Sequence, residues 1–174
     1  VKYLDFNSLF ISIKQKDVVL QLNLSMCNIK ELPSSVKELK NLESIDLSYN
    51  ELAVFPQVLY SYRHLETLYL DNNSISVLPD NINELKYVQF LSIEENKLVT
   101  VPEALSELVY LCELYLDNNS IITLPKNIGK LKSLQILSLE DNNLTSLPDS
   151  ICELTKLTDL YLINNKIETL PDNI

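Results

Sequence analysis

The sequence predicts an α/β solenoid, in which short strands and short helices alternate along successive coils of equal length. Two ladders of residues predict it. All seven prolines of the 174-residue chain recur at a constant interval, each after an apolar residue: Pro33, Pro56, Pro79, Pro102, Pro125, Pro148 and Pro171. A second ladder, with a cysteine at its first position, runs in phase with them: Cys27, Asn50, Asn73, Asn96, Asn119, Asn142 and Asn165. A fixed period of roughly 20 to 50 residues is typical of repeat architectures, in which each unit buries its apolar face against its neighbours.

Each coil combines a strand, an inward turn and a short helix. In the clearest copy, residues 65–85, the stretch Leu68-Tyr69-Leu70 alternates with period two, which is typical of a strand with one apolar and one solvated face. Asn73 follows the strand, where a buried amide would satisfy backbone groups of its own and adjacent coils. The Leu-Pro step favours extended backbone, and the apolar spacing after it predicts one or two helical turns. We therefore expect a concave parallel sheet and convex short helices or 3-10 turns.

The repeat resembles that of a known family. From coil to coil it reads L-x-x-L-x-L-x-x-N-x-L-x-x-L-P-x-x-I-x-x-L-x-x. This pattern is similar to the leucine-rich-repeat signature, L-x-x-L-x-L-x-x-N/C-x-L, in which Cys27 is an allowed variant. The L-P-x-x-I extension resembles the intracellular repeats of Ras-group plant proteins, Ras-pathway scaffolds and bacterial effector-type proteins. The resemblance implies a right-handed horseshoe of about seven coils over residues 18–174, in a single domain.

Residues 1–17 precede the first coil and do not follow the repeat. Four of their apolar residues have the i, i+3, i+4, i+7 spacing of a helix face: Phe6, Leu9, Phe10 and Ile13. Asp5 is a suitable N-cap for such a helix. We predict an amphipathic helix that caps the first coil, because the coil would otherwise expose its leucines. A partner helix or a membrane-surface helix is the alternative.

Composition narrows the class of protein. The chain has one glycine, Gly129, so it lacks a glycine-rich phosphate loop. No apolar run is long enough for a membrane span, and the start of the chain lacks the features of a signal peptide. Three scattered cysteines favour a reducing compartment, and we expect Cys27 and Cys112 in the core and Cys152 at the surface. A cytoplasmic protein is expected, with an exported bacterial protein acting in a host as the alternative.

The sequence contains no recognisable catalytic motif. The single histidine, His64, has no serine or cysteine nucleophile at a recognisable spacing, and we expect it at the surface. No pair of cysteines has the spacing of metal ligands. We therefore expect no enzymatic activity, no cofactor and no bound metal. A net charge of −10 disfavours nucleic acid as a partner, since phosphates need a basic face.

The strand positions that face solvent give the most information about function. We define the strand face as the positions that correspond to Thr67, Tyr69, Asp71 and Asn72 in each of the seven coils. The strand face contains no Lys or Arg, and nine of its members are acidic: Asp46, Asp71, Glu94, Glu95, Glu113, Asp117, Glu140, Asp141 and Asp159. With 24 acidic and 14 basic residues in the chain, random placement would give roughly four acids and two bases. The strand face is therefore more acidic than the net charge alone explains.

Two columns of the strand face stand out. The acidic column comprises Asp71, Glu94, Asp117 and Glu140, which we expect about 4.8 Å apart on neighbouring strands, where like charges repel. In the column beside it, large and small residues alternate: Tyr69, Ser92, Tyr115, Ser138 and Tyr161. The pattern therefore repeats every second coil, and each tyrosine gains room over a serine. Either the carboxylates are only solvated and were duplicated with the repeat, or they recognise a basic surface.

We predict a non-enzymatic scaffold or interaction module that binds a protein or peptide, expected to be basic, on the strand face. The residues predicted to contact it are Tyr69, Asp71, Phe90, Glu94, Glu113, Tyr115, Asp117, Glu140 and Tyr161. One alternative is a recognition segment of a larger ligase, kinase or GTPase, and another is a divalent-cation or glycan site on the carboxylates. The last coil stops after Pro171 without a polar cap, so we expect its open end to pack on further repeats or on another molecule.

Overall fold

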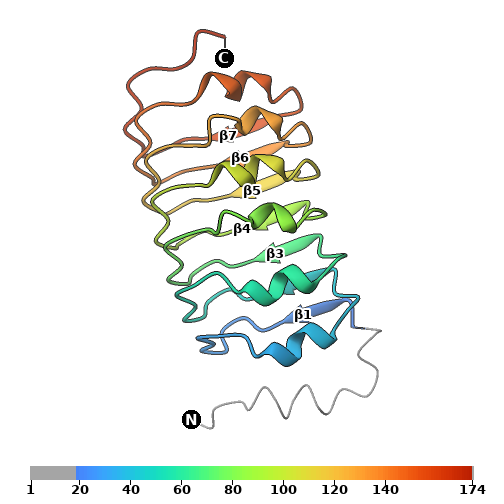
Figure 1. The fold of residues 1–174 in the computed structure, drawn as a ribbon. Coiled ribbons are helices and arrows are strands. Elements are labelled where there is room, and N and C mark those ends of the chain that lie inside the picture. The colour runs from blue at the N-terminus through green and yellow to red at the C-terminus, as the bar shows by residue number, and fades with distance from the viewer. Residues whose placement is uncertain (1–18, 174) are drawn as a thin grey trace.

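A computed structural model, which describes residues 19–173, has the expected repeat of strands and helices (Figure 1). The strands are β1 (Gln21–Asn23), β2 (Ser44–Asp46), β3 (Thr67–Tyr69), β4 (Phe90–Ser92), β5 (Glu113–Tyr115), β6 (Ile136–Ser138) and β7 (Asp159–Tyr161). The 3-10 helices between them are η2 (Ser34–Glu38), η3 (Gln57–Ser61), η4 (Ile82–Glu84), η5 (Glu103–Glu107), η6 (Ile128–Lys130) and η7 (Asp149–Glu153). The predicted N-terminal capping helix lies outside the described residues.

The strands form one open parallel sheet in chain order, from β1 to β7. The register advances by one repeat at each step, so that Ile45 pairs with Leu68 and Leu68 with Leu91. The ladder continues beyond the strands, because the Asn72 N–H donates to the Glu94 carbonyl and the Asn118 N–H to the Glu140 carbonyl. The backbone of the acidic column is therefore held at the spacing of the sheet.

The core lies between the strands and the helices. The central residue of each strand from β2 to β6 points inward and is 0% exposed: Ile45, Leu68, Leu91, Leu114 and Leu137. Helix residues such as Val36, Leu59 and Leu105 meet them from the other side and are buried as completely. Because burying one such side chain contributes about 1.5–3 kcal/mol, the stacked leucines are the main source of stability.

The asparagine ladder satisfies the turn after each strand, as predicted. The Asn96 Nδ2 donates to the carbonyls of Leu70 and Glu94 at 2.9 Å, and its Oδ1 accepts from the Ile75 N–H at 2.9 Å. One side chain therefore joins backbone groups of two coils. Leaving such a buried donor or acceptor without a partner costs about 1–3 kcal/mol. Cys27 replaces this residue in the first coil, and its thiol donates to the nearby Ser25 carbonyl.

A left-handed residue precedes each position of this ladder. Its φ lies between 50° and 56° in all seven coils: Met26, Tyr49, Asn72, Glu95, Asn118, Asp141 and Asn164. Asparagine and aspartate tolerate this conformation better than other non-glycine residues, so Met26, Tyr49 and Glu95 are strained there. The sequence predicted the inward turn but not its left-handed residue.

The helical segments are 3-10 helices of three to five residues. In η2, Pro33 precedes the first helical residue, and the Leu39 N–H closes the segment by donating to the Val36 carbonyl at 3.0 Å. Gly129 in η6 allows close packing against η7, because a Cβ there would lie 2.3 Å from the Ser150 carbonyl oxygen. No helix within residues 19–173 has the length and apolar character needed to cross a membrane.

The structure corrects the prediction for the cysteines and shows the open end of the last coil. Cys27, Cys112 and Cys152 are all half-buried free thiols, and Cys27 and Cys152 pack against the core. The prediction that Cys112 lies in the core and Cys152 at the surface is therefore wrong. Cys112 lies at the edge where a strand begins, and its N–H and carbonyl pair with the coils on either side. In the last coil, which meets a neighbour on one side only among the described residues, Leu170 is 56% exposed.

Candidate functional site: the strand face

The nine residues predicted to contact a partner share the strand face of coils three to seven (β3–β7). Phe90 and Glu113 begin their strands, whereas Tyr69, Tyr115 and Tyr161 end theirs. Each of the four residues of the acidic column lies two positions after the last residue of its strand. Eight of the nine side chains are half-buried, and Tyr161 is 43% exposed. The face is thus ordered by the sheet and still reachable from solvent.

Aromatic rings form a continuous row on this face. The Phe90 ring lies between those of Tyr69 and Tyr115, with centroid separations of 4.7 Å and 5.4 Å. Ser92 is the Cα partner of both tyrosines and is 4% exposed, so the small residue leaves room for them as expected. Sequence reasoning missed that Phe90 links the two tyrosines, because adjacent strands contribute these rings from opposite ends.

The row extends into a zigzag that we call the apolar stripe: Tyr69, Phe90, Tyr115, Ile136 and Tyr161. The apolar stripe consists of the last residue of β3, β5 and β7 and the first residue of β4 and β6. We call the coils of β3, β5 and β7 the tyrosine coils and those of β4 and β6 the serine coils, after the residue that ends the strand. The stripe repeats every two coils, which is the longer period of the sequence.

Carboxylates orient two of the tyrosines. The Tyr115 hydroxyl donates to Glu113 Oε2 at 3.0 Å, and the Tyr161 hydroxyl donates to Asp159 Oδ1 at 3.5 Å. Burial, and then the hydrogen bond and charge of Glu113, raise the pKa of Tyr115 to about 12. Tyr115 therefore stays neutral at physiological pH and offers an aromatic face beside an acid.

The aspartates of the acidic column bind the next coil. The Asp71 carboxylate accepts from the Ser92 hydroxyl and, at 2.9 Å, from the Glu94 N–H. Asp117 repeats this arrangement with Ser138 at 2.7 Å and with the Glu140 N–H. Both aspartates belong to tyrosine coils. Their carboxylates are used within the fold, which the sequence pattern did not distinguish.

The glutamates of the column belong to the serine coils, and Glu94 differs from the aspartates. Glu94 lies between two aspartates, and burial, followed by the charges of Asp71 and Asp117 and a hydrogen bond with Asp117, raises its pKa to about 7. Burial also raises the pKa of Asp71, although its hydrogen bonds with Ser92 and the Glu94 N–H act in the opposite direction. A cation placed beside Glu94 would favour its charged form.

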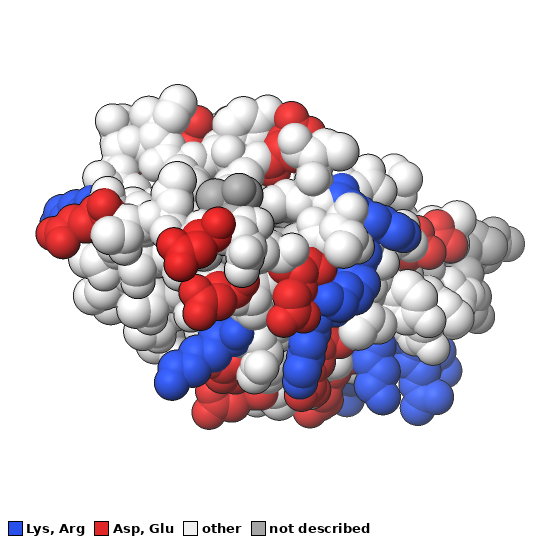
Figure 2. All heavy atoms as spheres, turned by 90° about the horizontal axis from the view of Figure 1, so that it is seen from above, with Lys and Arg blue, Asp and Glu red and all other residues white. Residues whose placement is uncertain are grey.

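Basic residues lie away from the strand face. Those of residues 19–173 lie in the helices and connecting segments: Lys30, Lys37, Lys40, Arg63, Lys86, Lys97, Lys126, Lys130, Lys132, Lys156 and Lys166. In the end-on view of Figure 2, Lys and Arg gather mainly toward the lower edge, and the upper edge shows Asp and Glu without them. The ion pairs between described residues, Lys30–Glu51 and Lys132–Glu153, also lie off the strand face.

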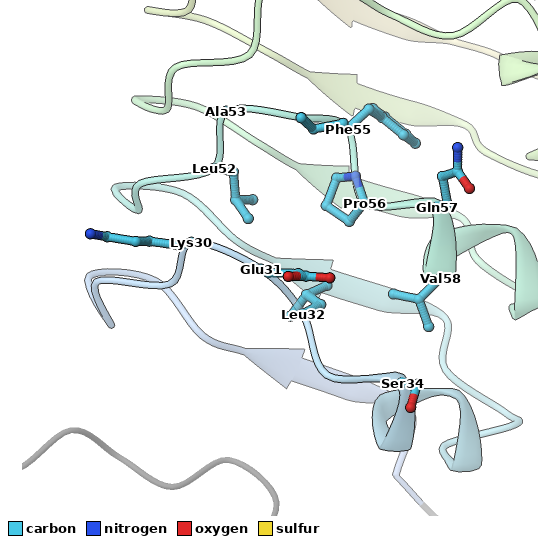
Figure 3. A pocket seen from close by; sticks show the side chains of 11 residues that line it. Lys30, Glu31, Leu32, Ser34, Leu52, Ala53, Phe55, Pro56, Gln57 and Val58 are labelled. Atoms are coloured by element: carbon cyan, nitrogen blue, oxygen red, sulfur yellow. The ribbon is translucent and has the colours of Figure 1, made fainter.

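Hollows also lie elsewhere on the solenoid. One of about 540 Å³ opens between the first two coils, where Leu32, Val54 and Val58 contribute apolar surface (Figure 3). Another, of about 900 Å³, lies at the edge where the strands begin, beside the exposed His64 and the stacked rings of Tyr87 and Tyr110. Within residues 19–173, no group of three or more His, Cys, Asp or Glu side chains is placed to hold a metal ion.

Comparison with known families accounts for nearly the whole described chain. A leucine rich repeat model matches residues 19–75 and 63–121, and a leucine-rich repeat region model matches residues 103–174. The chain belongs to the leucine-rich-repeat family. This agrees with the parallel sheet and the asparagine ladder, which are the structural counterparts of the repeated leucines and asparagines.

Relatives of this leucine-rich-repeat chain are longer. It is 43% identical over 56 residues to a probable serine/threonine-protein kinase of Dictyostelium discoideum, an alignment that covers 32% of this chain and 4% of the kinase. The crystal structure of a TDR receptor superposes with a TM-score of 0.76 at 27% identity, covering 84% of this chain and 26% of the receptor. The Arabidopsis receptor kinase HAESA, in complex with the peptide hormone IDA and the co-receptor SERK1, superposes with a TM-score of 0.76 at 26% identity, covering 87% and 27%.

Proposed function

We propose that this chain is a protein-interaction module that binds a protein or peptide on the strand face, and that the bound surface is basic. One observation carries the proposal: nine acids and no bases occupy the strand face, around an apolar stripe that the fold keeps partly exposed. Exposed aromatic area beside unneutralised charge is a typical composition for a binding surface. The module itself has no catalytic role in this proposal.

The charge distribution supports a basic partner. The described lysines and arginines lie off the strand face, so its carboxylates repel one another without an internal counter-ion. A basic partner would relieve this repulsion, whereas an acidic partner would increase it. The same field would accelerate encounter, and salt would weaken that acceleration because the Debye length is about 8 Å at physiological ionic strength.

Similarity to HAESA supports binding of a peptide or protein. That receptor was solved with a peptide hormone and a co-receptor, so a solenoid of similar fold does hold such partners. A second candidate function is that this chain is the recognition segment of a larger enzyme. The matched segment of the Dictyostelium kinase favours it, since the alignment covers 4% of the kinase, which therefore carries much more than these repeats.

The test is selection of peptides from a random displayed library against the purified chain. The informative variant is Glu94→Lys/Glu140→Lys, and the matched control is Asp80→Lys/Asp149→Lys, which makes the same charge change at exposed positions after two prolines. We expect basic peptides to be enriched, to bind the control variant and to lose binding to the strand-face variant. Enrichment of acidic or neutral peptides, or equal binding to both variants, would overturn the proposal. The full-length gene decides whether an enzyme domain accompanies the module.

A further inference from the structure

Two features of the strand face recur with the same two-coil period. Tyrosines recur in the tyrosine coils at Tyr69, Tyr115 and Tyr161, and the glutamates of the acidic column recur in the serine coils at Glu94 and Glu140. Two strand spacings amount to about 9.6 Å. A ligand that crosses the strands would therefore meet a tyrosine once in each two-coil period, and a glutamate of the acidic column at the same interval, half a period out of step.

From this spacing we infer that the ligand is a polyproline II segment with Lys or Arg at every third residue, lying across β3 to β7. The inference rests on the proposed function and specifies its partner. A polyproline II helix has three residues per turn and a rise of about 3.1 Å, so each of its faces repeats about every 9.3 Å. That repeat stays in step with the coils over the whole distance from Tyr69 to Tyr161.

Other peptide conformations do not match this period. A β-strand presents the same face about every 6.8 Å and would be out of step after one two-coil unit. An α-helix repeats its face about every 10.5 Å, after two turns, and it would drift by about 2 Å across four strand spacings. The polyproline II repeat drifts by about 0.6 Å over the same distance.

The chemistry of the surface fits the same ligand. Proline rings pack on aromatic side chains, and polyproline II segments dock in aromatic-lined grooves. The row of Tyr69, Phe90 and Tyr115 supplies such a surface, with ring centroids 4.7 Å and 5.4 Å apart. Cationic side chains are attracted both to the tyrosine faces and to carboxylates. A single binding geometry would thus place prolines on the apolar stripe and cations beside the glutamates.

The hydrogen bonds of the aspartates explain why the ligand would contact an acid of the column only in every second coil. The carboxylates of Asp71 and Asp117 already accept from a serine hydroxyl and a backbone N–H of the next coil. The Glu94 carboxyl lies between these two like charges and shares a hydrogen bond with Asp117, and a cation beside it would offset the two charges. Glu140 occupies the equivalent position of the next serine coil. Basic side chains at every third residue therefore reach the two glutamates, separated by one turn of the ligand.

The experiment measures affinity for four synthetic peptides with equal numbers of arginines. The first is four copies of Arg-Pro-Pro. The second has the same composition with arginines at alternating spacings of two and four, the third replaces both prolines by Gly and Ser, and the fourth is a helix-forming alanine peptide. We expect the first to bind at least about tenfold more tightly than the others, because only it combines the spacing with a preformed conformation.

Variants locate the contact. We expect Tyr115→Ala to weaken binding of the Arg-Pro-Pro peptide roughly 30-fold, as for a truncated hot spot. The control is Tyr87→Ala, which removes a 52% exposed tyrosine outside the strand face and should leave affinity unchanged. Circular dichroism and melting curves show that both variants are folded.

The outcomes separate this inference from the proposed function. Equal binding of the four peptides, or tightest binding of the helical one, overturns the polyproline II assignment while the basic-partner proposal stands. Failure of every basic peptide to bind overturns both. Equal losses from Tyr115→Ala and Tyr87→Ala place the contact elsewhere and also overturn the assignment.

Discussion

The tyrosine coils and the serine coils carry acids at the same repeat position, yet the structure uses them differently. In a tyrosine coil, Asp117 accepts hydrogen bonds from the Ser138 side chain and the Glu140 backbone. In the serine coils, Glu94 lies between two aspartates, and burial and those charges raise its pKa to about 7. The comparison teaches that a uniform acidic column can combine residues that hold the fold with residues that, in our proposal, bind a partner.

The next coil and side-chain length together account for the difference, because a tyrosine coil is followed by Ser92 or Ser138, whereas a serine coil is followed by a tyrosine. An aspartate carboxylate stays close to the sheet, where the serine hydroxyl and backbone N–H of the next coil are within reach. The additional methylene of a glutamate moves the carboxylate farther from the backbone. The sequence contains this alternation, but a pattern that treats Asp and Glu as one class of acid does not reveal its consequence.

The largest effect should come from converting a serine coil into a tyrosine coil. Ser92 is 4% exposed between Tyr69 and Tyr115, so Ser92→Tyr would overpack the row and lose the hydrogen bond to Asp71. We expect it to lower the free energy of unfolding by about 2–4 kcal/mol in denaturant titrations. Ser92→Ala isolates the hydrogen bond and should cost about 1 kcal/mol. Equal losses from the two variants would contradict the packing difference.

Removing an aspartate should matter more than removing a glutamate. Asp117→Ala leaves the Ser138 hydroxyl and the Glu140 N–H without their acceptor, and we expect it to cost about 1–3 kcal/mol of unfolding free energy. Glu140→Ala is the matched control and should change stability by no more than about 0.5 kcal/mol. Denaturant titration of both variants measures the difference. Similar values would show that the two acids have the same role.

The sequence predicted the elements whose cause is local and repeated. The strand from Thr67 to Tyr69 follows from period-two alternation, and the inward amide of Asn96 follows from its place after a strand. The family match confirms the leucine-rich-repeat prediction. The contact of Phe90 with two tyrosines and the left-handed turn at Glu95 depend on backbone geometry that the spacing does not contain. The predicted partner residues remain a hypothesis.

Glu94 should also make stability depend on pH. Asp71, Asp117 and Glu95 face it, and burial and these charges raise its pKa from 4.5 to about 7 in the fold. Between those values the folded state holds a proton that the unfolded state has lost, so this group's contribution to stability falls as pH rises from about 4.5 to about 7. We expect Glu94→Gln to melt at a higher temperature than the wild type at pH 8, with a smaller difference at pH 4. Glu140→Gln serves as the control, and a difference independent of pH would contradict the raised pKa.

The smallest effect concerns the left-handed residue of the turn. Tyrosine coils place asparagine there, as at Asn72 and Asn118, whereas a serine coil places Glu95 at a φ of 50°. Because asparagine tolerates this conformation better, Glu95→Asn should stabilise the chain by about 0.5–1 kcal/mol. Thermal melting measures it, and Asn118→Glu should show the reverse. A loss of stability in Glu95→Asn would indicate that the glutamate makes a compensating contact.

The central claim is that serine-coil glutamates serve a partner while tyrosine-coil aspartates serve the fold. It is tested most directly by calorimetric titration of the Arg-Pro-Pro peptide into two double variants, Glu94→Gln/Glu140→Gln and Asp71→Asn/Asp117→Asn. We predict that the glutamate variant loses at least about tenfold in affinity with unchanged or higher stability. The aspartate variant should melt at a lower temperature and, where folded, keep its affinity. Loss of affinity in the aspartate variant alone would contradict the account.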